Sequence, residues 1–313
     1  MSLVLDYLPN TDDIWVYVGL QQGYYAAHGI DLKVTVPTNF AATAELVGLG
    51  KFDIGLGSGG LGLLDPLLKR VPVISIATTM AKDTAGVISL PKEHINGPKD
   101  LIGKTFAMPN DPGSVADFKQ FMKFDGYSVD QVKVEYVNFS PPYILSGKAN
   151  AGLGVDWGEG VVVESSAHVK PVIQYFTDYG VPDNQGNIVF TSEKYAKANG
   201  DVLERFLLAT ALSIKRLLTD SKAASQAEEV ASTGPSKLGT LQQNLASLEA
   251  SRHAWFTTGS LNPDGQKYLV QNVSYWEAAY KWAVQIGYAK TYYDPSKVVT
   301  NQYITSAASN PQL

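Results

Sequence analysis

Acidic side chains stand in segments that follow apolar, strand-like runs of this sequence. Asp12 and Asp13 come soon after the first such run, and Asp156 and Glu159 follow another in the middle of the chain. Carboxylates in such loops accept hydrogen bonds from N–H donors or pair with cations. The ring of Trp157, between two of them, can stack on a flat heterocycle. The pattern indicates recognition of a flat ligand that offers donors.

Arginine is missing from the same segments. The chain has only four arginines, and none lies in a candidate loop: Arg70, Arg205, Arg216 and Arg252. A sulfonate, nitrate or carboxylate ligand would ordinarily bind an arginine, because the guanidinium group matches these anions. Helix N-termini also bind anions without arginine, so an anionic ligand is disfavoured rather than excluded.

Residues that commonly carry catalysis or bind metals form no convincing site. The absence of Cys excludes disulfides, thiolate zinc sites and a cysteine nucleophile, and the four histidines lack metal-ligand spacing. Gly55, Gly57 and Gly60 fit G-x-G-x-x-G, but no clear βαβ unit with a ribose-binding acid follows. The G-x-S-x-G motif fails at Leu56, and a P-loop fails at Pro98. We expect no catalytic residue, no metal site and no cofactor.

Predicted βα units position these loops. A strand at 3–7, a helix ending near Ala27 and a strand at 30–36 form the first unit. Further strands are predicted at 53–56, 71–79, 105–108, 132–137, 151–155 and 172–176, and helices at 39–50, 114–124, 199–219, 221–232, 237–256 and 262–287. In open parallel sheets ligands bind at the carboxyl ends of strands, which is where the first acidic loop stands.

Two extended segments, 85–90 and 187–190, bracket the middle of the chain. They indicate a discontinuous first domain, 1–88 and 190–313, with a second domain, 89–189, inserted into it. The expected fold is therefore α/β, with two doubly wound lobes, a two-strand hinge and a helical C-terminal region. Hinge closure would bring loops of both lobes around one ligand.

Composition agrees with a globular chain of about two domains, given 313 residues. The net charge of −5 and the lack of a basic block give no support for nucleic-acid binding. No apolar run approaches the length of a membrane span.

Six motifs carry a family resemblance. They are D-Y-L-P-N-T (6–11) with G-Y-Y-A-A-H-G-I-D-L (23–32), then G-L-G-K-F-D-I-G (48–55), P-K-D-L-I-G-K-T (98–105), L-S-G-K-A-N-A-G (145–152), D-Y-G-V-P (178–182) and D-P-S-K-V-V-T-N-Q-Y (294–303). In this order they resemble the thiamine-pyrimidine-type and sulfonate-type substrate-binding proteins of bacterial ABC importers. The family loop usually has His where this chain has Asp13.

The resemblance implies a two-lobed fold of the periplasmic binding protein type 2 class. It implies a monomeric, exported, non-enzymatic protein, periplasmic or on the cell surface, that delivers a small molecule to an ABC permease. No signal peptide precedes the first strand. The family would then place the leader, and any lipid-bearing Cys that anchors the protein to a membrane, outside this sequence.

The expected ligand is a thiamine-precursor pyrimidine, held between the lobes. The residues expected to contact it are Asn10, Thr11, Asp12, Phe40, Ser58 and Thr79 in the first domain and Asn110, Ser114, Trp157, Glu159 and Tyr179 in the second. Two of these have an alternative role, because Trp157 could serve packing and Glu159 could cap the helix that begins near Val161.

Two alternatives remain. The same class of protein could bind riboflavin or an alkylsulfonate. A more remote alternative is an enzyme like the fungal pyrimidine synthases, which share this fold. Those enzymes carry a Cys-rich motif, and this chain has no Cys.

Overall fold

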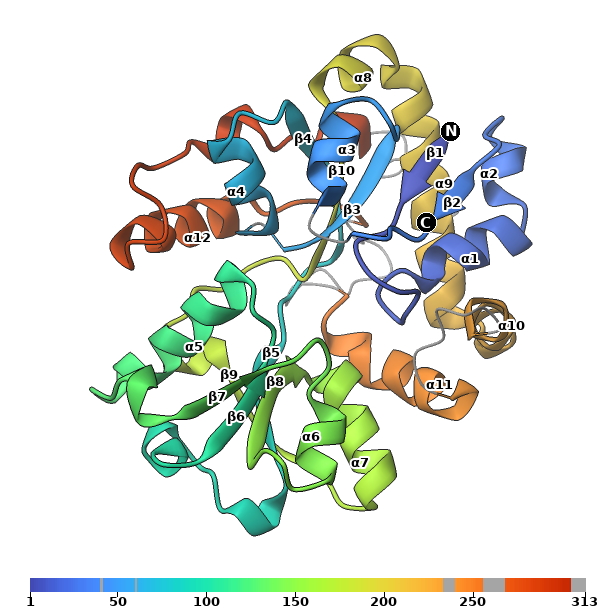
Figure 1. The fold of residues 1–313 in the computed structure, drawn as a ribbon. Helices are drawn as coiled ribbons and strands as arrows, with labels where there is room; N and C mark the ends of the chain where they lie inside the picture. Colours follow the sequence, from blue (N-terminus) through green and yellow to red (C-terminus); the bar gives the residue numbers. More distant parts are fainter. Residues whose placement is uncertain (40–41, 60, 233–239, 256–267, 305–313) are drawn as a thin grey trace.

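A computed structural model of the chain describes residues 1–39, 42–59, 61–232, 240–255 and 268–304. The described residues contain two five-stranded sheets, one in each of two lobes (Figure 1). The two-lobed α/β architecture predicted from the sequence is confirmed.

The first sheet has the order β2-β1-β3-β10-β4. These strands are β1 (Ser2–Val4), β2 (Lys33–Thr35), β3 (Ile54–Ser58), β4 (Val73–Met80) and β10 (Asn187–Ser192). Strand β1 runs parallel to β2 and β3, whereas β10 runs antiparallel to β3 and β4.

The second sheet repeats this plan with the order β7-β6-β8-β5-β9. Its strands are β5 (Ala85–Ser89), β6 (Thr105–Met108), β7 (Lys133–Tyr136), β8 (Ala151–Val155) and β9 (Val172–Tyr175). Strand β5 is antiparallel to β8 and β9. The sheets are mixed rather than wholly parallel, because β5 and β10, the strands that enter from the other lobe, each run against their neighbours.

Twelve helices of the described chain cover the sheets. They are α1 (Ile14–Gln21), α2 (Tyr24–Ala27), α3 (Thr43–Gly48), α4 (Leu61–Leu68), α5 (Pro112–Phe124), α6 (Pro141–Leu145), α7 (Val161–Ala167), α8 (Glu193–Ala198), α9 (Gly200–Thr219), α10 (Ser221–Ser232), α11 (Leu241–Ala250) and α12 (Val273–Gln285). The single helix predicted up to Ala27 is two helices, because Gly23 has φ of 70° and interrupts it.

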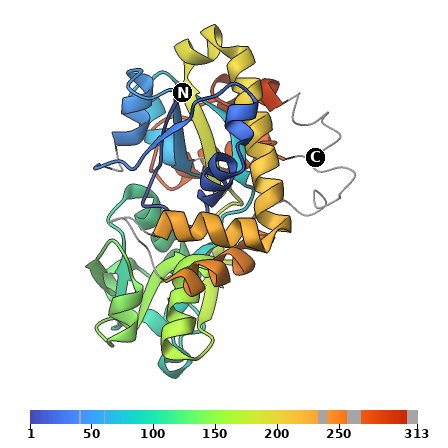
Figure 2. The same cartoon turned by 90° about the vertical axis from the view of Figure 1, so that its right-hand side faces the viewer.

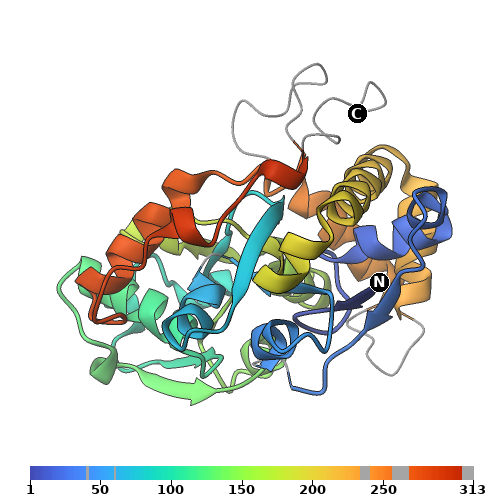
Figure 3. The ribbon, with the colours of Figure 1, turned by 90° about the horizontal axis from the view of Figure 1, so that it is seen from above.

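Alternate residues of the central strands bury opposite faces of the first sheet. Leu3 and Leu5 pack with the α1 and α9 side, whereas Val4 packs with α3, α4 and α12. Figure 3 shows α12 lying along its side of the lobe. Each fully buried large side chain contributes roughly 1.5–3 kcal/mol by leaving water.

The limits of the two domains, as predicted from the sequence, remain a prediction. Strand β5 belongs wholly to the second sheet and β10 to the first, so a boundary after β4 follows the sheets more closely than one at residue 88. Helix α11 belongs to the C-terminal region but lies against the second lobe (Figure 2). No helix in the described part of the chain is both long and apolar enough to span a membrane.

Candidate functional site

The loop after β1 and the turn after β8 meet at the junction of the lobes. That turn, Asp156–Gly160, is π-helical, a conformation that often marks functional sites. Its Trp157 is only 8% exposed and packs in the same cluster as the first-lobe residues Ile14 and Trp15. The alternative role expected for Trp157, packing, is what the structure describes.

The first loop is tied together by its own polar groups. Asn10 Oδ1 accepts from the Asp12 amide at 3.2 Å, and Asn10 Nδ2 donates to the Leu8 carbonyl at 3.1 Å. Asp13 stands at the N-cap of α1 but does not cap it. Its Oδ1 accepts from the Asn10 amide at 3.2 Å instead. Asn10 therefore has a structural role whether or not it also contacts a ligand.

Three first-lobe carboxylates crowd together here. Asp6 Oδ2 accepts from the Ser58 hydroxyl at 2.7 Å, and Asp12 Oδ2 accepts from Asn187 Nδ2 at 2.7 Å. Three further oxygens are buried without a hydrogen-bond partner among the described residues: Asp6 Oδ1, Asp12 Oδ1 and Asp13 Oδ2. Buried acceptors without partners are costly, so their presence is typical of a site that an outside molecule completes.

Burial and mutual repulsion disfavour the charged forms of these acids. Burial, and secondly the nearby Asp6, raise the pKa of Asp12 to about 8. The pKa of Asp13 is raised well above its ordinary value by burial and then by the charge of Asp12. Burial also raises the pKa of Asp6, against the hydrogen bond from Ser58. The first loop therefore favours a ligand that brings donors or positive charge.

Glu159 reaches the junction from the second lobe. Its Oε2 accepts from the Val155 amide at 3.0 Å, which ties it to the end of β8 rather than to α7. Gly154 makes this possible, since a Cβ there would lie 2.4 Å from the Glu159 Cβ. Burial raises the pKa of Glu159. The pKa of Tyr7 is raised first by burial and then by the charge of Glu159. Tyr7 of the first lobe therefore lies near Glu159.

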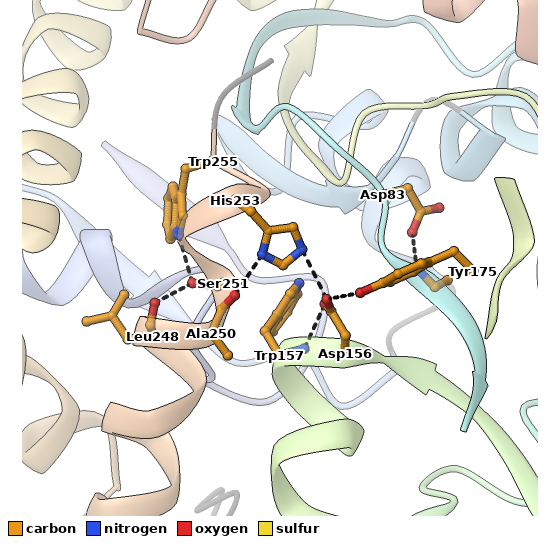
Figure 4. A network of polar contacts seen from close by, with 10 residues as sticks. Asp83, Asp156, Trp157, Tyr175, Leu248, Ala250, Ser251, His253 and Trp255 are labelled. Carbon is orange, nitrogen blue, oxygen red and sulfur yellow. Dashed lines mark hydrogen bonds and ion pairs between the residues drawn. The ribbon is translucent and has the colours of Figure 1, made fainter. Parts of the chain in front are cut away.

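Asp156 has the most hydrogen-bonding contacts among the acids of the site (Figure 4). Its Oδ1 accepts from the Trp157 amide at 2.8 Å, and its Oδ2 accepts from the Tyr175 hydroxyl at 2.7 Å. The Nε2 atom of His253 lies 3.0 Å from the same Oδ2. Sequence reasoning missed both His253 and Tyr175, because no local spacing relates them to Asp156.

The remaining predicted residues fall into different surroundings. Thr11 and Thr79 are buried in the first lobe, and Ser58 is exposed but donates to Asp6. Tyr179 packs on Phe121, with ring centroids 4.5 Å apart, and its hydroxyl donates to Gln174 Oε1 at 3.3 Å. These contacts account for Tyr179 as part of the second-lobe core.

Two predicted residues of the second lobe lie near the start of α5, and one prediction lies outside the described residues. Asn110 is exposed. The Ser114 amide donates to Asp111 Oδ1, which caps that helix. Phe40 is not among the described residues.

The described contacts of three of the arginines are with groups other than the acids of the site. Arg205 binds Asp201 and the His28 carbonyl, Arg216 binds Asp220, and Arg252 binds Glu249. Within the described residues, no group of three or more His, Asp or Glu side chains is arranged to hold a metal ion. The arrangement can accept hydrogen bonds from a ligand but offers no guanidinium to an anion.

Comparisons with known proteins agree with this fold. A formylaminopyrimidine-binding protein of Halalkalibacterium halodurans is 29% identical over 210 residues, a match that covers 66% of this chain and 62% of that protein. A 4-amino-5-hydroxymethyl-2-methylpyrimidine phosphate synthase of Saccharomyces cerevisiae is 26% identical over 165 residues, covering 52% of this chain and 48% of the synthase.

Among solved structures, the alkanesulfonate-binding protein SsuA of Xanthomonas axonopodis, bound to MOPS, matches with a TM-score of 0.66 at 14% identity. The match covers 96% of this chain and 97% of SsuA, and it supports the periplasmic binding protein fold alone. The family model described as "NMT1/THI5 like" matches residues 10–224. The chain therefore belongs to the NMT1/THI5-like family.

Proposed function

We propose that this protein is the extracytoplasmic solute-binding protein of an ABC importer and captures a thiamine-precursor pyrimidine between its lobes. The name of the bacterial relative and the two-lobed fold support this class. Its partners would be the small molecule and a permease. The protein would act as a monomer, in the periplasm or at the cell surface.

One observation carries the choice of ligand. Buried oxygens of Asp6 and Asp12 lack partners among the described residues, and Glu159 lies near Tyr7, the residue that follows Asp6. An aminopyrimidine has an exocyclic amino group that can donate to such oxygens, and a flat face for an aromatic side chain. We assign these four residues to the site, with Trp157 holding the lobes together beside them.

An alkylsulfonate is the weaker choice, although SsuA shares the fold. Its anionic head would meet three first-lobe carboxylates, and a sulfonate normally binds arginine or free amide groups. Riboflavin remains compatible with the acids, since a flavin also offers N–H groups and a flat ring system.

Binding without turnover is proposed because the chain has no Cys, whereas the resemblance gives the fungal synthases a Cys-rich motif. No nucleophile–base pair appears among the described contacts either.

Calorimetric titration with 4-amino-5-hydroxymethyl-2-methylpyrimidine, riboflavin and ethanesulfonate tests the proposal. The pyrimidine should bind with a one-to-one stoichiometry and the sulfonate should not bind. Chromatography of the titrated pyrimidine should recover it unchanged. Tight sulfonate binding without pyrimidine binding would overturn the choice of ligand, and conversion beyond one equivalent would overturn the choice of class.

A further inference from the structure

A hydrogen-bonded contact between His253 and Asp156 joins the two lobes (Figure 4). His253 ends the 3-10 turn Ser251–His253, which follows α11 in the C-terminal region. Asp156 begins the turn after β8 in the second lobe. The Asp156 side chain is 11% exposed and that of His253 is 48% exposed, so solvent screens the contact only from one side.

Both ring nitrogens of His253 face hydrogen-bond acceptors. Nδ1 lies 2.8 Å from the Ala250 carbonyl oxygen, which can only accept. Nε2 faces Asp156, whose two oxygens already accept from the Trp157 amide and the Tyr175 hydroxyl. An N–H is therefore needed at both ring nitrogens, and only the imidazolium has both.

The turn that carries His253 is attached to the first lobe by the residues after it, because Ala254 and Trp255 are buried in the same cluster as Leu3 and Phe206. Trp255 Nε1 donates to the Ser251 hydroxyl at 2.9 Å, and that hydroxyl donates to the Leu248 carbonyl at 2.8 Å. The Lys82 amide, in the segment between β4 and β5, donates to the Ala254 carbonyl at 3.0 Å. A force on His253 therefore acts between the lobes, close to where the chain crosses.

We propose that His253 is a positioning residue for the site: its imidazolium binds Asp156 across the lobes, favours the closed form and slows ligand release. We name His253, Asp156 and Tyr175 the interlobe latch. The part of this inference that concerns ligand release rests on the proposed function, whereas the part that concerns closure does not.

Raising the pH should open the latch. A ring that loses its Nε2 proton would turn a lone pair toward Asp156. Two other groups of charges are close in space or sequence: Asp83 lies near Asp156, and Arg252, the residue before His253, pairs with the exposed Glu249. Since the site acids titrate as well, the latch is identified by comparing variants rather than by the wild-type pH profile alone.

Interspin distances measure closure directly. The chain has no Cys, so Lys51→Cys in the first lobe and Lys119→Cys in the second, both exposed, give one spin label in each lobe. Distances are measured from pH 5.5 to 8.5, without ligand and with saturating 4-amino-5-hydroxymethyl-2-methylpyrimidine. From low to high pH, the closed-to-open ratio should fall roughly three- to tenfold more in the wild type than in His253→Gln.

Three further variants serve as controls. Asp156→Asn should remove the same pH dependence, and the double variant should add nothing. Gln243→Ala removes a neutral contact between the lobes, in which Nε2 donates to the Ser165 hydroxyl at 2.9 Å, and should leave the pH slope unchanged. His28→Gln removes a ring with a similar contact, 2.7 Å from the Tyr24 carbonyl, within the first lobe, and should change nothing.

Matching pH profiles for the wild type and His253→Gln, with and without the pyrimidine, would overturn the latch, as would additive effects of His253→Gln and Asp156→Asn. Failure of the pyrimidine to bind would count against the proposed function alone, because the distances without ligand still report closure.

Discussion

The acids of the two lobes meet at one junction but are satisfied very differently. In the first lobe, Asp6, Asp12 and Asp13 each leave a buried oxygen without a partner among the described residues. In the second lobe, Asp156 accepts from three donors, and Glu159 is bound to the end of β8. Unsatisfied groups are available to a ligand, whereas satisfied ones hold structure. We infer that the first lobe recognises the ligand and the second lobe keeps the site closed over it.

The largest expected effect is on how the free energy of unfolding of the ligand-free protein changes with pH. The pKa of Asp12 is raised to about 8 in the fold, above its value in an unfolded chain. Protonated Asp12 therefore stabilises the fold fully below about pH 4, and this contribution is lost as pH rises toward about 8. Urea unfolding should show a loss on the order of 5 kcal/mol from Asp12 over this window, at about 1.4 kcal/mol for each pKa unit, and Asp12→Asn should make the curve less steep. Equal slopes for both proteins would mean that Asp12 is not held protonated.

The next effect is on affinity. Above about pH 8, where Asp12 is charged, Asp12→Asn keeps the shape of the side chain but replaces a carboxylate acceptor. Pyrimidine binding there should weaken roughly ten- to a hundredfold, since hydrogen bonds to charged groups contribute about 1.5–3 kcal/mol. The melting temperature near pH 8 should stay the same or rise, because an unpartnered buried charge is removed. Calorimetry and thermal melts measure the two quantities. Asp130→Asn, at an exposed site of the second lobe, is the control. Lower stability with unchanged affinity would contradict a role of Asp12 in binding the ligand.

A smaller effect is expected at Glu159. Because its Oε2 already accepts from the Val155 amide, Glu159→Gln should lower the free energy of unfolding by about 1 kcal/mol and weaken binding by less than about tenfold. Chemical unfolding and calorimetry on the same preparation check both. If Glu159→Gln weakens binding more than Asp12→Asn does, the division of roles between the lobes is reversed.

Much of the fold could be predicted because it depends on local pattern. Strands β6 and β8 begin and end where their short apolar runs do, and α10 has the predicted bounds. The exceptions come from tertiary context. The antiparallel direction of β5 and β10 follows from their crossing between lobes, which no local pattern encodes.

The site was less predictable, for a physical reason. Sequence reasoning identified Asp12 and Glu159 as acids that follow strands, but it could not tell which of their oxygens would be used internally. Tyr179 has the residue type of a ligand contact, yet it packs on Phe121. His253 looked like an ordinary surface histidine, because its partner Asp156 is distant in sequence.

A crystal structure of the protein with 4-amino-5-hydroxymethyl-2-methylpyrimidine tests the central claim most directly. We expect the exocyclic amino group within hydrogen-bond distance of Asp6 or Asp12, at the oxygens that now lack partners, with the lobes closed and His253 on Asp156. A pyrimidine bound only by second-lobe groups, or bound elsewhere with these two carboxylates still unpartnered, would contradict the account.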